Sequence, residues 1–549
     1  MKDLILKCSL INAIEHDGKA SVQSVLGKVI GENPELKGKI KEIISDIQKT
    51  VDEVNSLSFD EQKKKFNDLG IVIEKKDSGT GLPELSNVVK GKVVMRAAPF
   101  PSGPLHIGNA RTYIVNDEYV KKHKGKLFLV IDDTIGSEEK QITPEAYKMI
   151  EYGLKWLGVN YNKKIVYKSD RLKIYYDYAE KIIKKSKAYV CTCSTERLRE
   201  NRANKKICEH RNQSVEETLE AWKKMFKMKE GQAVLRIKTD MNHPNPAFRD
   251  RVLFRICERN HPRTKKKYKV WPMLEFSWAI DDYLLGITHV IRGKELMIET
   301  DMEKYIFDIF GWKYPVFIHM GLLQLEGVKI SKSKGQKEIR EGKYSGWDDP
   351  RTWSLQSLKK RGITPEAIRK FVVDLGLNQN EITVPIDVLY AENRKIIDPL
   401  ANRYFAVLDP VQISIEEKIK STKVNFHPDF QKRGKRTIPI NNNRICVERE
   451  DFEKFYGKEI GLMNLCSVRL KKKSEVTSKN VKYEIQKIHW VSEPNIKIKI
   501  VMPDGNVKAG LGDPGMKKLK VDDMVQLQRI GFCRVDEVGI ERVLYFAHK

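Results

Sequence analysis

Residues 93–111 hold the first candidates for chemistry, a histidine and a glycine at the start of a predicted helix. The segment reads VVMRAAPFPSGPLHIGNAR, and its apolar run, Pro- and Gly-rich turn and following helix-compatible residues predict a strand, a tight loop and a helix start. Unsatisfied amides and the positive end of the helix dipole make such a start suitable for a polyphosphate. His106 can donate to a phosphate oxygen, and Gly108 lets a nucleotide approach closely. The alternative is an incidental histidine in a strand-to-helix turn.

A second segment with chemical potential lies more than two hundred residues later, where residues 329–333 read KISKS. A mobile loop with two lysines can close over a triphosphate and stabilise the charge that builds on departing pyrophosphate. The alternative is a solvated surface loop in a basic protein. The histidine segment opens the first half of a nucleotide-binding fold and the lysine segment follows its second half, and this order argues against coincidence.

Together the two segments resemble the HIGH and KMSKS signatures of the class I aminoacyl-tRNA synthetases, with Asn109 ending the first and Ile330 replacing Met in the second. The resemblance implies an enzyme that uses ATP and Mg²⁺ and forms AMP. It implies catalytic roles for His106, Asn109, Lys329 and Lys332, and nucleotide contacts from Pro99, Gly108, Ser331 and Ser333.

Two carboxylates follow the next predicted strand, residues 127–131, as Asp132 and Asp133. The carboxyl ends of parallel strands are where open α/β sheets bind ligands, although a helix or turn cap is the simpler alternative. The segment resembles the glutamyl- and glutaminyl-tRNA synthetases, in which the first acid holds the amino group of the substrate. The match is imperfect, because Val130 replaces the usual Arg and Ile135-Gly136 replaces the usual Asn/Asp-Pro.

Four residues between 191 and 210 have the spacing of a metal site. Cys-x-Cys at Cys191 and Cys193 precedes Cys-x-His at Cys208 and His210. Three thiolates and an imidazole suit a closed tetrahedral Zn²⁺ site with a structural role. The alternative is a set of reduced, ordinary cysteines.

Residues 286–293, GITHVIRG, resemble glutamyl-tRNA synthetases of the archaeal and eukaryotic type. The resemblance makes Arg96 the residue that faces the side-chain carboxylate of the substrate and Arg292 a second candidate for a substrate carboxylate. Leu274 stands where many relatives have a Tyr that touches the substrate side chain. We hypothesise that the two arginines leave a net positive pocket that no nearby acid neutralises, with Phe100 where glutaminyl relatives can carry an acid.

Composition bounds the class of protein. The 549 residues contain 101 Lys and Arg against 74 Asp and Glu, a net charge of +27 that favours a nucleic-acid partner, although a lysine-rich proteome gives the same surplus. No apolar run reaches the ~20 residues that span a bilayer, and the first twenty residues lack signal-peptide features, so we expect a cytoplasmic protein. Eight scattered cysteines do not indicate a disulfide framework.

We therefore expect a multidomain α/β fold in which a Rossmann-type class I catalytic domain is split by a zinc-bearing insertion. A helical amino-terminal segment precedes it, where residues 40–54 carry an apolar stripe, and carboxyl-terminal all-β barrels follow it, as the alternation in residues 496–500 indicates. With the roles that the resemblance to these synthetases implies, the expected domains are a helical domain (1–88), the first catalytic half (89–190), an acceptor-end-binding insertion (191–270), the second catalytic half with the lysine loop (271–335), a helical connection (336–396) and an anticodon-binding β-barrel domain (397–549).

These features predict a glutamate-tRNA ligase that joins L-glutamate to tRNA-Glu; whether it also charges tRNA-Gln is open, and a monomer is favoured. A glutaminyl-tRNA synthetase shares the fold and both signatures, but the Cys/His cluster and the 286–293 stretch speak against it. A nucleotidyltransferase with a related His signature needs neither zinc insertion nor anticodon barrels. The intact lysine loop disfavours an RNA-binding protein with a relic nucleotide site.

Overall fold

The chain divides between Thr80 and Gly81 into two compact units, whereas the sequence put the first boundary near residue 88. The computed structural model describes residues 2–15, 18–33, 36, 40–69, 81–135, 141–328 and 331–549. Residues 76–83 read KDSGTGLP, whose Gly, Ser and Pro content predicts a linker, and residues 76–80 of this stretch lie outside the described residues. Residues 81–88 belong to the second unit because they pack into its core and accept hydrogen bonds from it. Leu85 is buried in its core, and the Tyr119 hydroxyl donates to the carbonyl of Pro83 at 2.7 Å.

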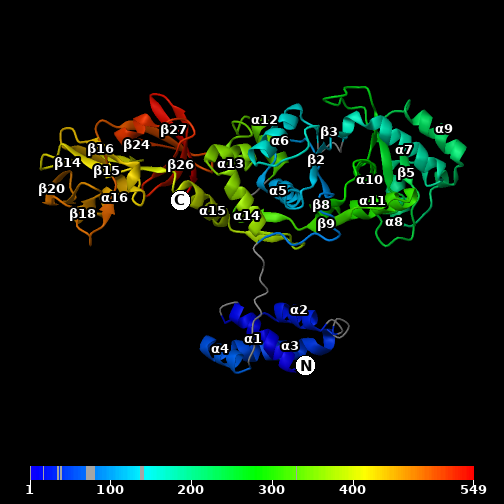
Figure 1. Cartoon of the computed structure of the whole chain (residues 1–549), viewed down its shortest axis with the longest axis horizontal. Coiled ribbons are helices and arrows are strands. Elements are labelled where there is room, and N and C mark those ends of the chain that lie inside the picture. The colour runs from blue at the N-terminus through cyan, green and yellow to red at the C-terminus, as the bar shows by residue number, and fades with distance from the viewer. Residues whose placement is uncertain are drawn as a thin grey trace. The chain divides into compact units, whose positions relative to one another are not determined.

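The first unit is helical, as predicted. Its helices are α1 (Lys2–Glu15), α2 (Val22–Glu32), α3 (Ile40–Asn55) and α4 (Phe59–Asp68), shown in blue in Figure 1. The predicted apolar stripe of α3 forms much of the core, in which Ile43, Ile47, Val51 and Val54 are buried. Ile40, the first residue of the helix, and Ile44, at the edge of the stripe, are instead 37% exposed.

The second unit is built around short parallel strands. The first half of the catalytic region contributes β1 (Val94–Ala97), β2 (Lys126–Ile131) and β3 (Val166–Tyr167), and the second half contributes β8 (His289–Gly293) and β9 (Val316–Met320). The two halves lie side by side, because the amide of Thr288 donates to the carbonyl of Val94 at 2.9 Å. The carboxyl ends of β1 and β8 therefore face the same space, as expected for a ligand site in an α/β fold.

Helices connect and cover these strands. They are α5 (Ile107–Lys122), α6 (Pro144–Trp156), α10 (Leu274–Leu284) and α11 (Met297–Phe310). Helix α5 begins directly after the Pro- and Gly-rich turn that follows β1, as the sequence predicts. Its apolar residues Ile107, Ile114 and Val115 are fully buried, so the helix start is fixed by packing against the core.

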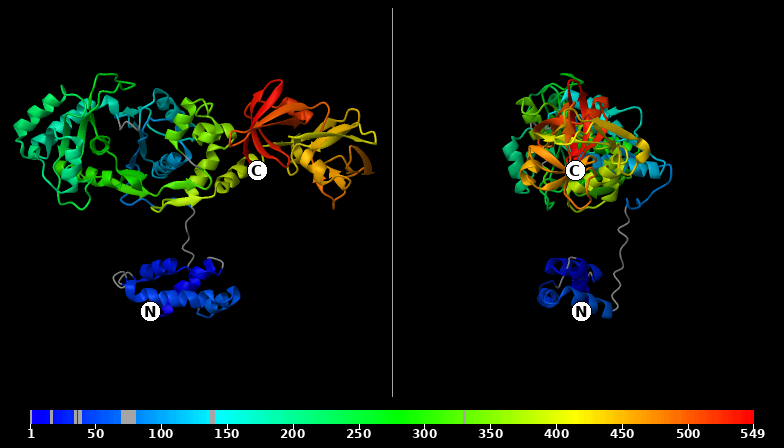
Figure 2. Two further views of the ribbon diagram at one scale, coloured as in Figure 1. Left: turned by 180° about the vertical axis from the view of Figure 1, so that it is seen from behind. Right: turned by 90° about the vertical axis from the view of Figure 1, so that its left-hand side faces the viewer.

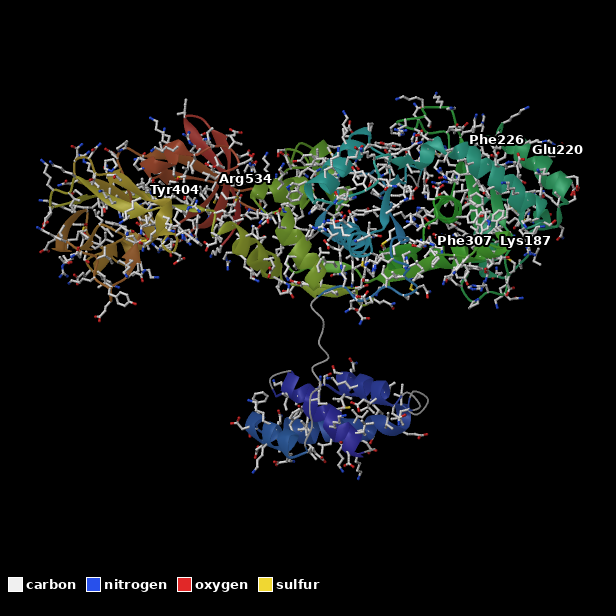
Figure 3. All side chains as sticks on the ribbon, in the orientation of Figure 1. Lys187, Glu220, Phe226, Phe307, Tyr404 and Arg534 are labelled. Carbon is white, nitrogen blue, oxygen red and sulfur yellow. The ribbon has the colours of Figure 1, made fainter. Side chains whose placement is uncertain are left out.

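The insertion between the two halves forms a separate antiparallel sheet. Its strands are β4 (Ala188–Cys191), β5 (Val234–Ile237), β6 (Val252–Ile256) and β7 (Val270–Pro272), paired in that order, and its helices are α7 (Leu172–Lys184), α8 (Thr195–Ala203) and α9 (Val215–Met225). Trp222 of α9 packs edge-on against the labelled Phe226 and against Phe254 of β6 (Figure 3). In Figures 1 and 2 this sheet and the carboxyl-terminal sheets lie on opposite sides of the parallel strands.

A helical segment joins the catalytic region to the carboxyl-terminal sheets. It contains α12 (Lys332–Arg340), α13 (Leu355–Arg361), α14 (Pro365–Asp374) and α15 (Ile386–Ile397), with β10 (Leu323–Leu325) paired to β11 (Ile382–Val384). Helix α13 is held at both ends. The amide of Leu355 donates to the carbonyl of Leu105 at 2.9 Å, and the Arg361 guanidinium donates to the carbonyls of Phe546 and Ala547 at 3.3 and 2.8 Å.

The carboxyl-terminal region is built from β-strands, with α16 (Arg449–Lys454) and two short 3₁₀ helices, Gln431–Arg433 and Pro514–Lys518, between them. One seven-stranded sheet has the order β12 (Asn402–Tyr404), β25 (Met524–Leu527), β26 (Gly531–Val538), β27 (Glu541–His548), β23 (Ile496–Val501), β24 (Val507–Gly512) and β13 (Ala406–Val407). Its edge strands β12 and β13 are consecutive in the chain, so this sheet curls back on itself like a barrel. Tyr404 and Arg534, labelled in Figure 3, belong to it.

A second seven-stranded sheet has the order β21 (Lys487–Ile488), β18 (Glu459–Leu462), β19 (Cys466–Arg469), β20 (Lys473–Ser478), β14 (Pro410–Ile415), β17 (Arg444–Glu448) and β22 (Val491–Ser492), beside the hairpin β15 (Ser421–Asn425) and β16 (Lys435–Pro439). The alternation in residues 496–500 correctly predicted β23, where Ile498 and Ile500 are buried and Lys497 and Lys499 are exposed. Within the described residues, no helix is both long and apolar enough to cross a membrane.

Candidate active site

A cavity of about 360 Å³ opens where β1 and β8 end and α5 begins. Six of the residues predicted from the sequence line it: Arg96, Pro99, His106, Asn109, Arg292 and Lys332. Among the described residues, Gly108, Asp132, Leu274 and Ser331 lie outside its lining. Lys329 lies outside the described residues, as does the side chain of Ser333.

His106 caps the helix at which it stands. Its backbone is extended, and its Nδ1 accepts a hydrogen bond from the amide of Asn109 at 3.3 Å. Burial, reinforced by the nearby positive charge of Lys332, lowers the pKa of His106 from 6.5 to about 3. The imidazole is therefore neutral at ordinary pH, and because Nδ1 is an acceptor, the proton belongs on Nε2. This leaves one N–H donor for a ligand.

Gly108 leaves room for the ring of His106. A Cβ built on Gly108 would stand 3.2 Å from Cε1 and Nδ1 of the His106 ring, which is closer than ordinary packing allows. The sequence reasoning gave this glycine to the approaching nucleotide. In the structure its lack of a side chain makes room for the capping imidazole.

The second signature lies at the start of α12. Ser331 is the N-cap of this helix, and its hydroxyl accepts from the amide of Lys334 at 3.2 Å. Lys332 and Gln336, one turn apart, both line the cavity. The lysine segment therefore presents a helix start and an ammonium group to the same space as His106, an arrangement suited to a polyphosphate.

The two cavity arginines are neutralised by buried acids, so the hypothesis of a pocket without nearby acids is wrong. Arg96 pairs with Asp282 through Nε–Oδ1 at 2.5 Å and Nη2–Oδ2 at 3.0 Å. Arg292 pairs with Glu303 at 2.7 and 2.8 Å. A guanidinium this deeply buried needs a counter-charge, and the acids come from α10 and α11. Neither acid lines the cavity. A ligand in the cavity would therefore contact the guanidinium groups, and the carboxylates lie behind them.

Burial also sets the charge states of these pairs. Burial opposes the charge of Arg96, but the adjacent Asp282 carboxylate outweighs it and raises the pKa of the guanidinium. Burial raises the pKa of Glu303, while Arg292 acts in the opposite direction. The bidentate geometry of both pairs fixes the planes of the two guanidinium groups.

Asp132 and Asp133 are already committed to neighbours within the protein. Lys168 contacts Oδ2 of Asp132 at 3.2 Å, and the Thr134 hydroxyl donates to Oδ1 at 3.1 Å. Asp133 accepts from the amide and hydroxyl of Ser169 at 2.8 and 2.7 Å, and its burial raises its pKa. Both carboxylates are thus part of a buried polar network beside the cavity.

Sequence reasoning missed several residues of the site. Trp278, Gln336 and Glu295 line the cavity, and Lys168, Asp282 and Glu303 support the residues that do. Trp278 and Asp282 follow Leu274 at intervals of four on α10, and this helical spacing could have placed them on one face. Leu274 itself, the first residue of α10, is 36% exposed and outside the lining.

The four metal-ligand candidates lie together in the insertion. Their ligand atoms are all within 4.8 Å of one another, with Sγ of Cys208 at 3.6 Å from Cys191, 3.5 Å from Cys193 and 3.2 Å from Nδ1 of His210. Zn–S bonds of about 2.3 Å place tetrahedral sulfur atoms about 3.8 Å apart. The Thr192 hydroxyl meets Nε2 of His210 at 2.9 Å, so the ring presents Nδ1 to the three sulfurs.

Comparisons with known proteins give one consistent result. Residues 92–399 match the family described as tRNA synthetases class I (E and Q), catalytic domain, and residues 401–488 and 487–536 match two families described as the anticodon-binding domain of the same enzymes. The glutamate–tRNA ligase of Thermococcus kodakarensis is 44% identical over the whole of both chains. That of Pyrococcus abyssi is 45% identical, over 100% of this chain and 99% of its own.

Among solved structures, a glutamate tRNA ligase from Elizabethkingia meningosepticum in complex with its amino acid is 22% identical. It aligns with a TM-score of 0.42 over 57% of this chain and 71% of its own.

Proposed function

The chain belongs to the class I tRNA synthetases for glutamate and glutamine, and from this membership we propose that it is a glutamate–tRNA ligase. The cavity carries the proposal, because His106 and Lys332 of the two phosphate segments line the same space as Arg96 and Arg292. Glutaminyl-tRNA synthesis is the weaker alternative, since the full-length relatives at 44% and 45% identity are glutamate–tRNA ligases.

In the first step, an oxygen of the glutamate α-carboxylate attacks the α-phosphorus of ATP, and pyrophosphate leaves as the mixed anhydride forms. The neutral His106 donates its Nε2–H to a phosphate oxygen, aided by the amides at the start of α5. Lys332 stabilises the charge on the departing pyrophosphate. Lys329 and Ser333 share this task, and Asn109, Pro99 and Ser331 shape the nucleotide site. Mg²⁺ bound to the substrate ATP would neutralise part of the triphosphate charge.

In the second step, a ribose hydroxyl of the terminal tRNA adenosine attacks the carbonyl carbon of the anhydride, and AMP leaves. Neither step needs a protein nucleophile, so catalysis rests on positioning and charge stabilisation. The carboxyl-terminal sheets bind the anticodon region of tRNA-Glu. We infer that the protein works in the cytoplasm, where it would meet ATP and tRNA. Whether the enzyme also charges tRNA-Gln is open. Aminoacylation of tRNA with a swapped anticodon tests this.

Glutamate is held by the two arginines. Arg96 binds the side-chain carboxylate and Arg292 binds a substrate carboxylate, because each guanidinium lines the cavity while its acid stands behind it. Asp132 holds the substrate ammonium only if it shares its carboxylate with Lys168. Leu274 replaces an aromatic contact and contributes at most the edge of this pocket.

A structural Zn²⁺ is held by Cys191, Cys193, Cys208 and His210. Three sulfurs and one imidazole nitrogen fit this ion and leave no position for a substrate, and the metal would fix the end of β4 to the 3₁₀ turn Glu209–Asn212, which follows α8. Burial raises the pKa of the Cys191 thiol to about 12, so a cation is needed to keep it deprotonated. The Arg236 guanidinium, 3.9 Å from Cys191 Sγ, offsets part of the thiolate charge.

One assay tests the function as a whole. ATP–pyrophosphate exchange is measured with glutamate and then with glutamine, each with and without tRNA. Exchange that depends on glutamate supports the proposal. Exchange with glutamine alone assigns the glutaminyl alternative, and no exchange with either amino acid in the presence of tRNA contradicts both.

A further inference from the structure

Trp278 stands among three buried cations at the wall of the active-site cavity. Its ring centroid lies 4.9 Å from Cζ of Arg96, 4.9 Å from Nζ of Lys168 and 5.1 Å from Cζ of Arg292. The side chain comes from α10, is 5% exposed and lines the cavity. One indole therefore lies beside three cations of the buried polar network that borders the proposed glutamate site.

Each of these cations is also held by its own acid. Asp282 binds Arg96, Glu303 binds Arg292, and Asp132 contacts Lys168. The acids fix the cations from the side away from the cavity, and the electron-rich face of the indole attracts them from within it. Trp278 is thus placed to set the spacing between the two guanidinium groups, which the acids alone do not bridge.

The polar atom of Trp278, its indole nitrogen, has no hydrogen-bond partner in the part of the chain that the structure describes. Its Nε1 is buried, and among the described residues no acceptor reaches it. A buried N–H without an acceptor is costly, and buried Trp residues usually find one. Because the residue lines a cavity whose cations select anions, the missing acceptor is best supplied by an anionic ligand.

We propose that Trp278 is a glutamate-binding residue whose Nε1–H donates to a substrate carboxylate oxygen and whose ring holds Arg96 and Arg292 at the spacing that the substrate needs. The inference rests on the proposed function and adds to it a recognition residue in the amino-acid pocket. It assigns Trp278 no part in binding ATP or in the chemical step, which concern His106 and Lys332.

Two substitutions in the full-length protein separate the N–H donor from the ring. Trp278→Phe keeps an aromatic face but removes the donor, and we expect it to raise the glutamate KM about tenfold, the effect of one hydrogen bond to a charged group. Trp278→Leu removes both, and we expect a rise of about a hundredfold. The ATP KM and the rate at saturating glutamate should change by less than about twofold.

The matched control is Trp271→Phe, the same change at a second buried tryptophan whose Nε1 also lacks an acceptor among the described residues. Trp271 stacks on His261, with ring centroids 5.1 Å apart, and does not line the cavity. The glutamate KM of the Trp271→Phe variant should match that of the wild type. The shift of the thermal unfolding midpoint by glutamate gives a second readout, which should shrink in Trp278→Phe and not in Trp271→Phe.

A Trp278→Phe variant with the wild-type glutamate KM, or an equal rise in Trp271→Phe, overturns the inference. A variant whose ATP KM rises as much as its glutamate KM also overturns it, because general disorder of the cavity then explains the loss. If the leucine variant does not fold, the phenylalanine variant still decides. A wild-type enzyme that does not activate glutamate contradicts the proposed function instead, before any variant is compared.

Discussion

The Arg96 guanidinium and the Asp282 carboxylate form a buried, bidentate ion pair between residues 186 positions apart in the chain. Arg96 belongs to the first catalytic half and Asp282 to the second, and in the sequence the insertion lies between them. One interaction therefore joins the two halves and orients a residue of the cavity.

Asp282→Asn should destabilise the protein by about 3–5 kcal/mol, because it leaves a buried guanidinium without its counter-charge. Urea unfolding measures the change. The control is Glu381→Gln, which removes an exposed partner of Lys294 at 3.4 Å and should cost less than about 1 kcal/mol. Equal losses of unfolding free energy in the two variants would show that the buried pair stabilises the protein no more than an exposed pair does.

Arg96→Ala should raise the glutamate KM about a hundredfold, equivalent to roughly 3 kcal/mol, and should penalise glutamine less. Since the single variant leaves Asp282 unpaired, the double variant Arg96→Ala, Asp282→Asn separates binding from folding. It should recover stability while its glutamate KM stays high. A KM that recovers with stability would remove Arg96 from substrate recognition.

Lys332→Ala should lower the rate of glutamate activation by about two to three orders of magnitude, the scale of losing one preorganised donor, with tRNA affinity nearly unchanged. Lys337→Ala is the control, because Lys337 stands on the same helix and its side chain is 71% exposed. Single-turnover formation of the adenylate measures the rate. Comparable losses of rate and tRNA affinity in Lys332→Ala would contradict the assigned role.

The pH dependence of stability should report His106. Its pKa in the folded protein is lowered from 6.5 to about 3, so the unfolded chain binds the proton first and stability falls as the pH drops through that window. Above pH 6.5 the histidine contributes no slope. In His106→Gln, the unfolding free energy should fall less steeply than in the wild type as the pH is lowered. Parallel curves would show that the imidazole is not held neutral.

Protein purified without chelator should contain one Zn²⁺ per chain, and Cys208→Ser should lose most of it, because the four ligand atoms form one closed set. Elemental analysis measures the content. Cys533→Ser, at a buried cysteine outside the cluster, should keep its zinc. A wild-type chain without stoichiometric zinc would contradict the site.

The sequence predicted the parts of the site that local patterns encode. A strand, a turn and a helix start are local features, and they correctly placed β1 and the start of α5 around His106. The acids behind the arginines could not be predicted in this way, because Asp282 and Glu303 reach Arg96 and Arg292 only after α10 and α11 pack against the strands. The close approach of Gly108 to the His106 ring could not be predicted either, since a glycine beside a histidine does not reveal that the capping imidazole needs the space.

The fold shows the same division. Alternation of apolar and charged residues predicted β23, and the spacing of apolar residues predicted α3. The pairing order of both seven-stranded sheets depends on contacts between distant residues, as in the sheet whose opposite edges are β12 and β13. No pattern within one segment contains that information.

Helix α13 connects β27, the last strand of the chain, to the backbone beside the proposed nucleotide site. Its seven residues span about 10 Å at 1.5 Å per residue, from the backbone beside His106 to the carbonyls of Phe546 and Ala547. A truncation that removes Phe546 and Ala547 would leave the Arg361 guanidinium without these two acceptors. Protein engineers who shorten this end, or fuse a partner to it, should expect to disturb ATP binding as well as tRNA binding.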